Sequence, residues 1–505
     1  MREELKSKEV LAMYDIRGIQ SYIFKSNLAK EIIGASVLVK DIIKDGLEAY
    51  VGEENEEYIL DWQKDNATEF LNNESVQMQV MFIGGGNAYV LFRTGDVCEK
   101  VNRFLARYIL ENTYSLNLAV AVVEKTNSYK DDYTKINEEM RRIKAHMPLS
   151  QPMGALPFMK ADSITGYPLT TKEMYPDKTE FICTEAKLKR EKFPKNESEK
   201  VFDNMVTEKG DNSTLAVCHI DGNSMGQFIK DIMSVKPHYK EAILAMREIS
   251  SKISDTFKNT FKGMETYMET LSEQIKPGKL HRKIVVAGDD ITFVCNAKLA
   301  IPAVKYFLSH IGEQEIVVSG EKEYFSACAG IAYFNSHFPF SDAYQVAEAC
   351  CSSAKNRAKA KENRGKNEKV GNFFDFQICT NVRAADLSAY RDKHYKTNEG
   401  LFIARPYYVS TMKDEYKINT KNEKYSVKKL DAWLERVNLM PRSKAKQLRD
   451  IIPMGENERE KEVSFLTSRG YKDFEKSEKE YPIWYDALEI MDFSLEEGGT
   501  DENKN

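Results

Sequence analysis

The sequence contains one pattern twice, and a duplication of this length restricts the chain to folds built from two similar domains. The first copy reads LAMYDIRGIQSYIF around Asp15 and then QVMFIGGGNAYVLF, and the second reads LAVCHIDGNSMGQFI around Asp221 and then IVVAGDDITFVC. Asp15 and Asn87 are 72 positions apart, and Asp221 and Asp290 are 69 positions apart. Solenoid repeats are shorter, at about 20–50 residues, so this repeat predicts a duplicated domain.

Both copies follow the same order of expected elements. An apolar strand ends at the aspartate, and a helix, a hairpin, a second helix and a strand of small apolar residues follow. That last strand is LNLAVAVVE at 116–124 in the first copy and FSACAGIAYF at 325–334 in the second. The order predicts a ferredoxin-like sheet, and in the first copy we expect its helices on one face. In the second copy we also expect helices over 240–275 and 341–360, and further strands at NFFDFQIC and LFIARPYYV.

Changes in composition divide the rest of the chain. The insert combines a charged helix (Lys135 to Lys144), a stretch rich in Pro and Gly, and a basic run. Towards the C-terminus, Leu430, Trp433, Leu434 and Val437 share one helical face, and helices are expected over 443–452 and 457–469. The predicted domains are 1–127 (first copy, degenerate GGGN turn), 128–212 (helical and loop insert), 213–411 (second copy, AGDD turn), 412–492 (helical C-terminal domain) and 493–505 (disordered tail).

Composition favours a cytoplasmic protein without a membrane segment. With 505 residues, 42% hydrophobic and 30% charged, the chain can hold about three or four domains with proper cores. The N-terminal MREELKSKEV has no apolar signal region, and no apolar run reaches the roughly 18 residues that a membrane span needs. The eight cysteines form no Cys-x-x-Cys pair, so we expect buried thiols. The net charge of −5 argues against general coating of nucleic acid.

Three acids of the second copy are expected to meet. Asp221 ends the first strand, and Asp289 and Asp290 lie at the tip of the hairpin that pairs beside it. Clustered carboxylates repel one another unless a cation joins them, and oxygen ligands suit Mg²⁺ or Mn²⁺ together with substrate phosphates. The pattern predicts phosphoryl or nucleotidyl transfer. The first copy has Gly86 and Asn87 instead, so metal chemistry is assigned to the second copy.

Neighbouring residues could bind the phosphates of a nucleotide. The turn DGNSMG at 221–226 opens a helix whose amides can bind triphosphate oxygens, with Asn223 or Ser224 as the expected cap. Gly288 allows a tight hairpin turn and keeps the surface above the acids clear. Lys355 could reach the β- and γ-phosphates, and Lys359 follows one turn later.

Each of these signals also has a purely structural interpretation. A lone Gly-Asp-Asp is most often a hairpin turn, and an Asp after a strand is usually a helix cap. The run from Lys355 to Lys369 is more often a solvated helix face, and His219 is more often packed than catalytic. The duplicated spacing, with both acidic signals in register, favours the functional interpretation.

At these motifs the chain resembles the large polymerase-like subunit of type III CRISPR effectors, whose two palm domains face each other. DGNSMG at 221–226 is similar to that family's Asp-Gly-Asp-x-Met-Gly element, and AGDD at 287–290 to its Gly-Gly-Asp-Asp. YDIRGIQSYIF resembles the first-palm Asp-Ile-x-Gly-Ile-Gln element, and SACAGIAYFNSHFPFSDAYQVAEACCSSAK the region after the acidic hairpin. The resemblance covers 11–127 and 213–410 and implies an α+β protein: two ferredoxin-like palm domains of the nucleotide cyclase and polymerase type, with a helical insert and a helical C-terminal domain.

The resemblance implies which residues act. Asp221, Asp289 and Asp290 would be catalytic and would hold two Mg²⁺ or Mn²⁺ ions, with ATP as the substrate. The residues expected to contact nucleotide are Gly222, Asn223, Ser224, Met225, Gly226, Gly288 and Lys355, together with the acceptor-pocket turn Gly84, Gly85, Gly86 and Asn87. Expected partners are nucleoside triphosphates, RNA or CRISPR effector subunits, and further copies of the chain. The family's His-Asp nuclease dipeptide and the zinc-binding Cys pairs do not occur, and Asn223 and Ala287 replace family residues.

The function expected from this resemblance is a metal-dependent nucleotidyltransferase that joins ATP into a cyclic or short oligonucleotide messenger in antiviral defence. One alternative is a purine nucleotide or dinucleotide cyclase, since those enzymes share the palm and the acidic hairpin. A second alternative is a non-catalytic scaffold subunit of a CRISPR RNA effector.

Overall fold

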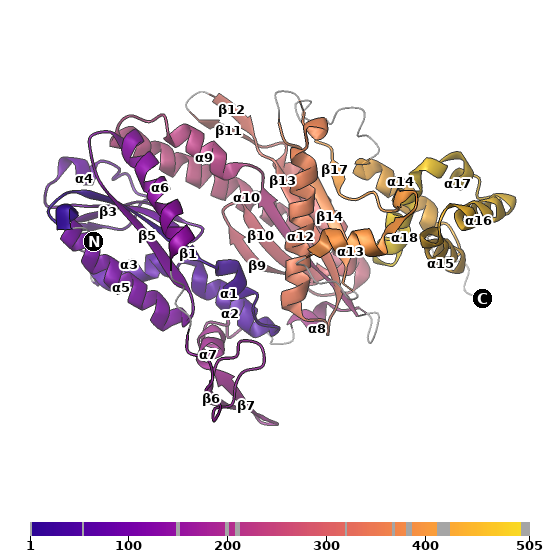
Figure 1. Ribbon diagram of the computed structural model, residues 1–505, viewed down its shortest axis with the longest axis horizontal. Coiled ribbons are helices and arrows are strands. Elements are labelled where there is room, and N and C mark those ends of the chain that lie inside the picture. Colours follow the sequence, from indigo (N-terminus) through magenta and orange to yellow (C-terminus); the bar gives the residue numbers. More distant parts are fainter. Residues whose placement is uncertain are drawn as a thin grey trace.

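The chain forms two sheets, a projecting insert and a C-terminal group of helices (Figure 1). The computed structural model describes residues 3–52, 55–147, 152–196, 201–207, 213–318, 321–365, 369–379, 386–411 and 425–495. In Figure 1 the first sheet lies on the left, the second in the middle and the C-terminal helices on the right. The chain positions at which one domain ends and the next begins stay predictions.

The first sheet has five strands in the order β2-β3-β4-β1-β5. These strands are β1 (Val10–Arg17), β2 (Tyr58–Ile59), β3 (Met78–Gly84), β4 (Asn87–Phe92) and β5 (Asn117–Glu124). Apart from the short β2, this is the order of the ferredoxin-like fold. β1 is antiparallel to both neighbours, and Asp15 lies opposite Asn87 on one side and Ala119 on the other.

Helices cover both faces of the first sheet, whereas the sequence suggested one face. The helices are α1 (Ile19–Ile23), α2 (Ala29–Lys40), α3 (Ile42–Val51), α4 (Glu69–Asn72), α5 (Gly95–Thr113) and α6 (Tyr129–His146). Alternate residues of a strand point to opposite faces. Val10 and Ala12 therefore join the core that includes α5, and Leu11 joins the core that includes Tyr129 of α6. Because β1 is apolar on both faces, the charged helix α6 packs against the sheet as well.

The second sheet repeats the first and extends it. Its order is β17-β14-β13-β8-β10-β9. The strands are β8 (Thr214–Gly222), β9 (His281–Ala287), β10 (Asp290–Asn296), β13 (Ala327–Asn335), β14 (Asn372–Ile378) and β17 (Tyr407–Val409). The order β13-β8-β10-β9 corresponds to β5-β1-β4-β3 of the first sheet. The structure confirms the predicted duplication and the two added strands.

The second sheet is also covered on both faces. Its helices are α9 (Met225–Met233), α10 (Tyr239–Ile275), α11 (Ala297–Ile311), α12 (Phe340–Lys359) and α13 (Leu387–His394). Leu215 and Val217 of β8 share a core with α12, and Ala216 and Cys218 share the other core with α10 and α11. Burial on both faces explains why this strand is an almost continuous apolar run. The eight cysteines are all buried with free thiols, as expected.

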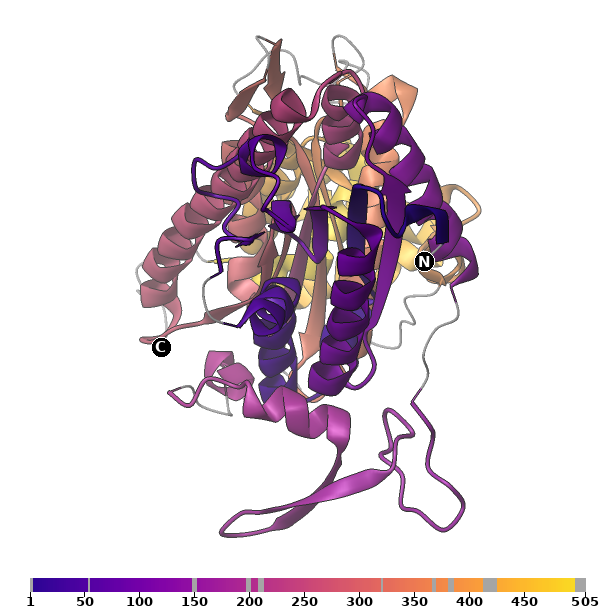
Figure 2. The same ribbon diagram turned by 90° about the vertical axis from the view of Figure 1, so that its left-hand side faces the viewer.

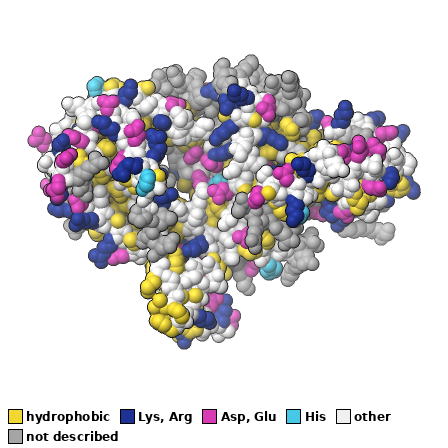
Figure 3. Space-filling model, in the orientation of Figure 1, with side chains coloured by type: hydrophobic (Ala, Val, Ile, Leu, Met, Phe, Trp, Pro, Cys, Tyr) yellow, Lys and Arg dark blue, Asp and Glu magenta, His cyan; other side chains and the backbone are white. Residues whose placement is uncertain are grey.

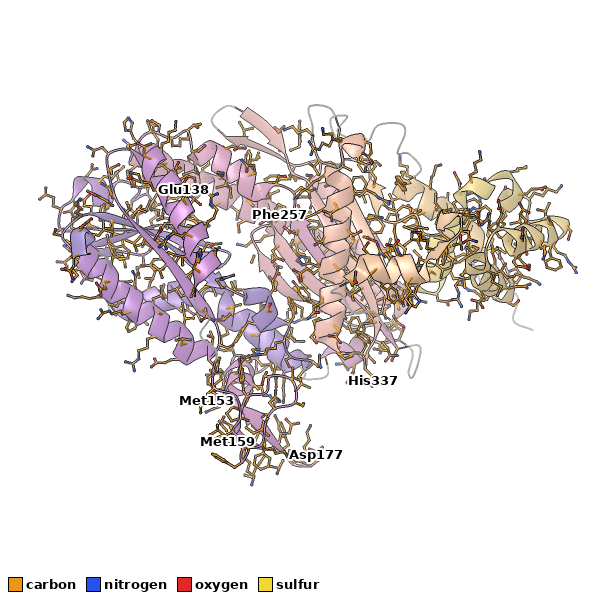
Figure 4. The ribbon with its side chains drawn as sticks, viewed as in Figure 1. Glu138, Met153, Met159, Asp177, Phe257 and His337 are labelled. Carbon is orange, nitrogen blue, oxygen red and sulfur yellow. The ribbon has the colours of Figure 1, made fainter. Side chains whose placement is uncertain are left out.

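The insert carries a β-hairpin as well as helices. Its elements are β6 (Leu169–Met174), β7 (Thr179–Cys183), α7 (Thr184–Glu191) and α8 (Val201–Met205). The hairpin projects from the rest of the chain in two perpendicular views (Figures 1 and 2), and Met153, Met159 and Asp177 mark this region in Figure 4. Hydrophobic side chains gather on this projecting region (Figure 3). Phe158, which lies between Met153 and Met159 in the sequence, is 80% exposed. The sequence interpretation of a helical insert with loops missed the hairpin.

The C-terminal helices match the expected pattern. They are α14 (Val427–Asn438), α15 (Arg442–Ile451), α16 (Glu456–Ser468), α17 (Asp473–Lys476) and α18 (Tyr481–Ile490). Leu430, Trp433 and Val437 of α14 are buried. In α18, the buried Asp486 carboxylate accepts hydrogen bonds from Arg405 N and Tyr407 Oη, which fixes these helices to the second sheet. Of the predicted disordered tail at 493–505, residues 493–495 are described, and the Phe493 ring stacks on Tyr333 of β13. The rest of the predicted tail lies outside the described residues.

Two further pairs of short strands complete the fold, β11 (Glu315–Val318) with β12 (Glu321–Tyr324) and β15 (Lys396–Thr397) with β16 (Gly400–Leu401). None of the helices in the described ranges has the length and apolar character needed to cross a membrane.

Candidate active site

The three acids of the second copy meet at one end of the second sheet. Asp221 near the end of β8 lies directly opposite Asp290, the first residue of β10. Residues opposite each other on antiparallel strands share a face, with Cβ atoms about 4.5–5.5 Å apart. Asp289 lies in the hairpin turn, and its backbone oxygen accepts a hydrogen bond of 3.2 Å from Gly222 N. The predicted convergence of the acids is confirmed, and their catalytic role stays a prediction.

Gly222 allows the close approach of Asp289. A Cβ atom at position 222 would lie 2.8 Å from Asp289 Cβ and 2.9 Å from Asp289 Oδ2. Real Cβ contacts are longer than this, so a side chain here would displace the carboxylate. Gly288, at the hairpin tip, has a φ of 62°, which favours glycine, and its position opens to free space. Both glycines therefore shape the acidic end of the sheet.

The acids affect one another electrostatically. Burial, followed by repulsion from Asp221, raises the pKa of Asp289 to about 6. Burial also raises the pKa of Asp290 to about 6, with Asp221 adding to the rise and a hydrogen bond from Gln20 opposing it. Because the uncharged forms are favoured, the cluster carries a cost that a cation could relieve.

Lys355 of α12 lies within this cluster. Its ammonium donates hydrogen bonds to Asp221 Oδ2 and, at 3.1 Å, to the backbone oxygen of Gly222. Burial lowers the pKa of Lys355, but attraction to Asp221 and the hydrogen bond outweigh burial and leave the pKa above its usual value. Lys359, one turn later, is exposed. On α12, Lys355 therefore contacts the acids, whereas Lys359 lies at the surface.

Gln20 is a site residue that the sequence did not single out. Its Nε2 atom, on α1 beside the first sheet, donates a 2.7 Å hydrogen bond to Asp290 Oδ2 in the second sheet. The residue belongs to the YDIRGIQSYIF motif, but no spacing rule connects that motif to a hairpin 270 positions away. Only the packing of the two sheets brings the residues together.

The donor set fits a divalent cation. Among the described residues, no group of three or more His, Cys, Asp and Glu side chains is arranged around a metal position. Lys355 and Gln20 take one oxygen each of Asp221 and Asp290. The second oxygen of the Asp290 carboxylate, Oδ1, is buried and has no hydrogen-bond partner in the described part of the chain. A buried carboxylate oxygen without a partner costs free energy, and a bound cation would remove that cost. Because Mg²⁺ and Mn²⁺ prefer hard oxygen donors, the carboxylates of Asp221, Asp289 and Asp290 could hold such an ion.

His219 is packed in the core, as the sequence interpretation favoured. Its Nδ1 atom lies 3.1 Å from Thr292 Oγ1 and 3.6 Å from Asp290 Oδ1. Burial lowers the pKa of His219, so the imidazole is neutral at pH 7 and makes no ion pair with Asp290. The ring lies edge-on to Tyr344 of α12. His219 therefore forms part of the wall below the acids.

The turn before α9 differs from the expected cap. Ser224 occupies the N-cap position in a left-handed conformation with φ of 58°, and its side chain makes no capping hydrogen bond. The buried Asn223 amide instead donates to Ser326 Oγ at 3.1 Å and Gly371 O at 3.2 Å. Ser224 is therefore the N-cap residue, as predicted, but neither side chain caps the helix, because Asn223 bonds to the segments before β13 and β14. Met225 and Gly226 form the first turn of α9, as expected.

The first sheet repeats this geometry without the acids. Ile16 N donates to Gly86 O at 2.9 Å, as Gly222 N does to Asp289 O. Gly86 and Asn87 therefore correspond to Asp289 and Asp290. A Cβ atom on Gly86 would lie 2.4 Å from Ile19 Cδ1, so an apolar side chain fills the space of the missing acid. Gly84 ends β3, and Gly85 completes the turn with φ of 60°.

The duplication extends to a lysine. Lys144 of α6 bonds to Asp15 as Lys355 of α12 bonds to Asp221. Each lysine is the sixteenth residue of its helix, and the two helices follow the corresponding strands β5 and β13. Sequence comparison of the acidic motifs alone did not reveal this correspondence.

The fold and the site define a protein with two palm domains of the nucleotide cyclase and polymerase type. Residues 214–369 match the family model described as Cas10/Cmr2, second palm domain. This part of the chain is therefore similar to the second palm domain of Cas10/Cmr2, and Asp221, Asp289 and Asp290 lie within the matched residues.

Solved structures of similar fold come from Csm1–Csm4 assemblies. The chain is similar to a chain of the Csm1–Csm4 cassette in complex with cA4, with 12% identity and a TM-score of 0.47, over 97% of this chain and 70% of that chain. The cassette in complex with one ATP gives the same values. The Csm1–Csm4 subcomplex of the type III-A CRISPR-Csm interference complex gives 12% identity and a TM-score of 0.45, over 98% and 71%. No curated protein matches the chain.

Proposed function

We propose that the chain is a nucleotidyltransferase that joins ATP, or other nucleoside triphosphates, into a cyclic or short oligonucleotide messenger in antiviral defence. The observation that carries the proposal is the register of β8 and β10, which places Asp221 opposite Asp290 with Asp289 against Gly222. Bound Mg²⁺ or Mn²⁺ would lower the pKa of an attacking hydroxyl and neutralise charge on the transferred phosphate and the leaving pyrophosphate.

The other roles follow from the positions of the residues. Asp221, Asp289 and Asp290 would hold the ions, and the first turn of α9 would bind phosphate oxygens with its amides. Lys355 would bind the terminal phosphates when a cation takes its place at Asp221. The Gly84–Asn87 turn would line the pocket of the acceptor nucleotide. RNA, CRISPR effector subunits and further copies of the chain are the partners that the similarity to this family suggests.

Mass spectrometry of the reaction products tests the proposal. Purified protein is incubated with ATP, GTP or all four nucleoside triphosphates and Mn²⁺. Cyclic or linear oligonucleotides with released pyrophosphate support the proposal, and a cyclic mononucleotide or a dinucleotide assigns the chain to the cyclases. Absence of turnover, with co-purified guide RNA, identifies a scaffold subunit.

A further inference from the structure

α1 lies between the two hairpin turns that define the palms. Figure 1 shows α1 and α2 between the first sheet and β9 of the second. Two adjacent residues of α1 face different palms. Ile19 packs against Gly86 of the first-palm turn, and Gln20 bonds to Asp290 of the second-palm turn. This short helix therefore contacts both the degenerate turn and the acidic turn.

The Gln20 bond restricts the Asp290 carboxylate. The terminal torsion of an aspartate side chain is broad, so the carboxylate plane needs a partner to fix it. Gln20 Nε2 donates a hydrogen bond of 2.7 Å to Asp290 Oδ2. The other oxygen of the carboxylate, Oδ1, is buried and has no hydrogen-bond partner in the described ranges. The bond therefore determines which oxygen of Asp290 is available to a cation.

α1 is itself fixed to the second palm at the residues that follow it. The Phe24 ring stacks on Tyr344 of α12 with centroids 3.6 Å apart. Asn27 Oδ1 accepts hydrogen bonds from the backbone nitrogen and the hydroxyl of Ser341, at 3.3 Å and 3.2 Å. The helix that carries Lys355 thus also holds the segment that carries Gln20. Because Ile19 of α1 packs against the first-palm turn, a change in the arrangement of the palms would act on α1 and on the bond from Gln20 to Asp290.

We propose that Gln20 is a positioning residue for the second-palm acids, through which the arrangement of the two palms sets the affinity of Asp290 for a divalent cation. The inference rests on the cation site of the proposed function. Hydrogen-bond partners of metal ligands orient those ligands, and their loss typically costs about 10–100-fold in metal affinity. Because coupling between sites is reciprocal, cation binding must in turn stabilise the contact between α1 and the acidic turn.

Mn²⁺ binding to the full chain, measured by electron paramagnetic resonance, tests the first half of the inference. Gln20→Leu keeps the approximate volume and removes the donor, so the Kd for Mn²⁺ should rise about tenfold. Asn27→Ala is the matched control, because it removes a contact between the palms but keeps the Gln20 donor, so its Kd should rise by less than that of Gln20→Leu. Equal affinity of Gln20→Leu and wild type overturns the proposal, and so does an equal loss in Asn27→Ala.

Hydrogen exchange of the wild-type protein tests the second half and needs no variant. Addition of Mn²⁺ should slow amide exchange in α1, although this helix belongs to the first palm. Exchange in α1 that is unchanged by saturating Mn²⁺ contradicts the inference. A wild-type protein that binds no Mn²⁺ overturns both the proposed cation site and this inference, whereas normal wild-type binding with unaffected Gln20→Leu overturns the inference alone.

Discussion

At the scale of single residues, the charged forms of Asp289 and Asp290 are destabilised in the folded protein. Each carboxyl has a pKa of about 6, first because it is buried and then because Asp221 lies beside it. A raised pKa in the folded state means that the folded protein binds protons more tightly than the unfolded chain. The acids therefore contribute stability below their ordinary pKa, and this contribution is lost as the pH rises through about 6.

Removal of these charges should stabilise the protein at high pH. Without divalent cations, the Asp289→Asn, Asp290→Asn variant should exceed wild type in free energy of unfolding by about 1–3 kcal/mol at pH 8. The difference should shrink towards pH 4.5, because the wild-type carboxyls are then protonated. Thermal melting at both pH values measures it, and a difference independent of pH would contradict the assigned cause.

Lys355 should discriminate between nucleotides by their terminal phosphate. A charge-assisted contact contributes about 1.5–3 kcal/mol, so Lys355→Ala should weaken ATP binding roughly ten- to a hundredfold and ADP binding less. Calorimetric titration of both nucleotides measures this effect. The control is Lys359→Ala, because Lys359 is exposed on the same helix. Equal weakening of ATP and ADP binding would show that Lys355 acts through Asp221 alone.

At the scale of elements, the contact between β8 and the β9–β10 turn holds the acids together. Gly222 and Asp289 approach so closely that no side chain fits between them. Gly226 lies four residues further on, in the first turn of α9, where an added Cβ atom would meet no other atom within 4 Å. The two glycines of one motif therefore serve different purposes, and substitution can separate them.

Gly222→Ala should lower the free energy of unfolding by about 1–3 kcal/mol, because the new methyl group overlaps Asp289 and Met225. The same variant should weaken Mn²⁺ binding, since Asp289 must move. Gly226→Ala is the control and should leave stability unchanged or raise it by about 0.5–1 kcal/mol, because alanine favours the helix. A Gly222→Ala protein as stable as wild type would show that the turn adapts without cost.

The elements that carry the acids could be predicted from the sequence because strand periodicity and repeat spacing are local signals. The similar spacing in the two copies indicated that Asp221 lies opposite Asp290, as Asp15 lies opposite Asn87. The cross-palm contact of Gln20 and the direction of the Asn223 amide could not be predicted, because tertiary packing decides them. The second covered face of the first sheet was missed because the charged pattern of α6 obscured its buried side.

At the scale of the whole molecule, two similar palms differ in which one has acids. Both have a lysine bonded to the aspartate of the first strand, Lys144 in the first palm and Lys355 in the second. Only the second has carboxylates in the hairpin turn, since Ile19 fills the corresponding space beside Gly86. The asymmetry suggests that the first palm contributes a nucleotide pocket and the second contributes the chemistry.

Substitution of the two equivalent aspartates tests this division. Asp15→Ala should lower stability or acceptor binding but keep Mn²⁺ affinity within about twofold of wild type, because Asp15 belongs to the first palm. Asp221→Ala should weaken Mn²⁺ binding at least about tenfold. Mn²⁺ titration of both variants compares them. Loss of binding in Asp15→Ala alone would mean that the palms have the opposite roles.

Pyrophosphate release is the most direct test of whether Asp289 and Asp290 of the second palm are catalytic. Release from ATP with Mn²⁺ is measured for wild type and for the Asp289→Ala, Asp290→Ala variant, with melting temperature as the check on folding. Wild type should release pyrophosphate steadily, and a variant that remains folded should release none. Equal release by wild type and a folded variant would contradict the catalytic role of these acids.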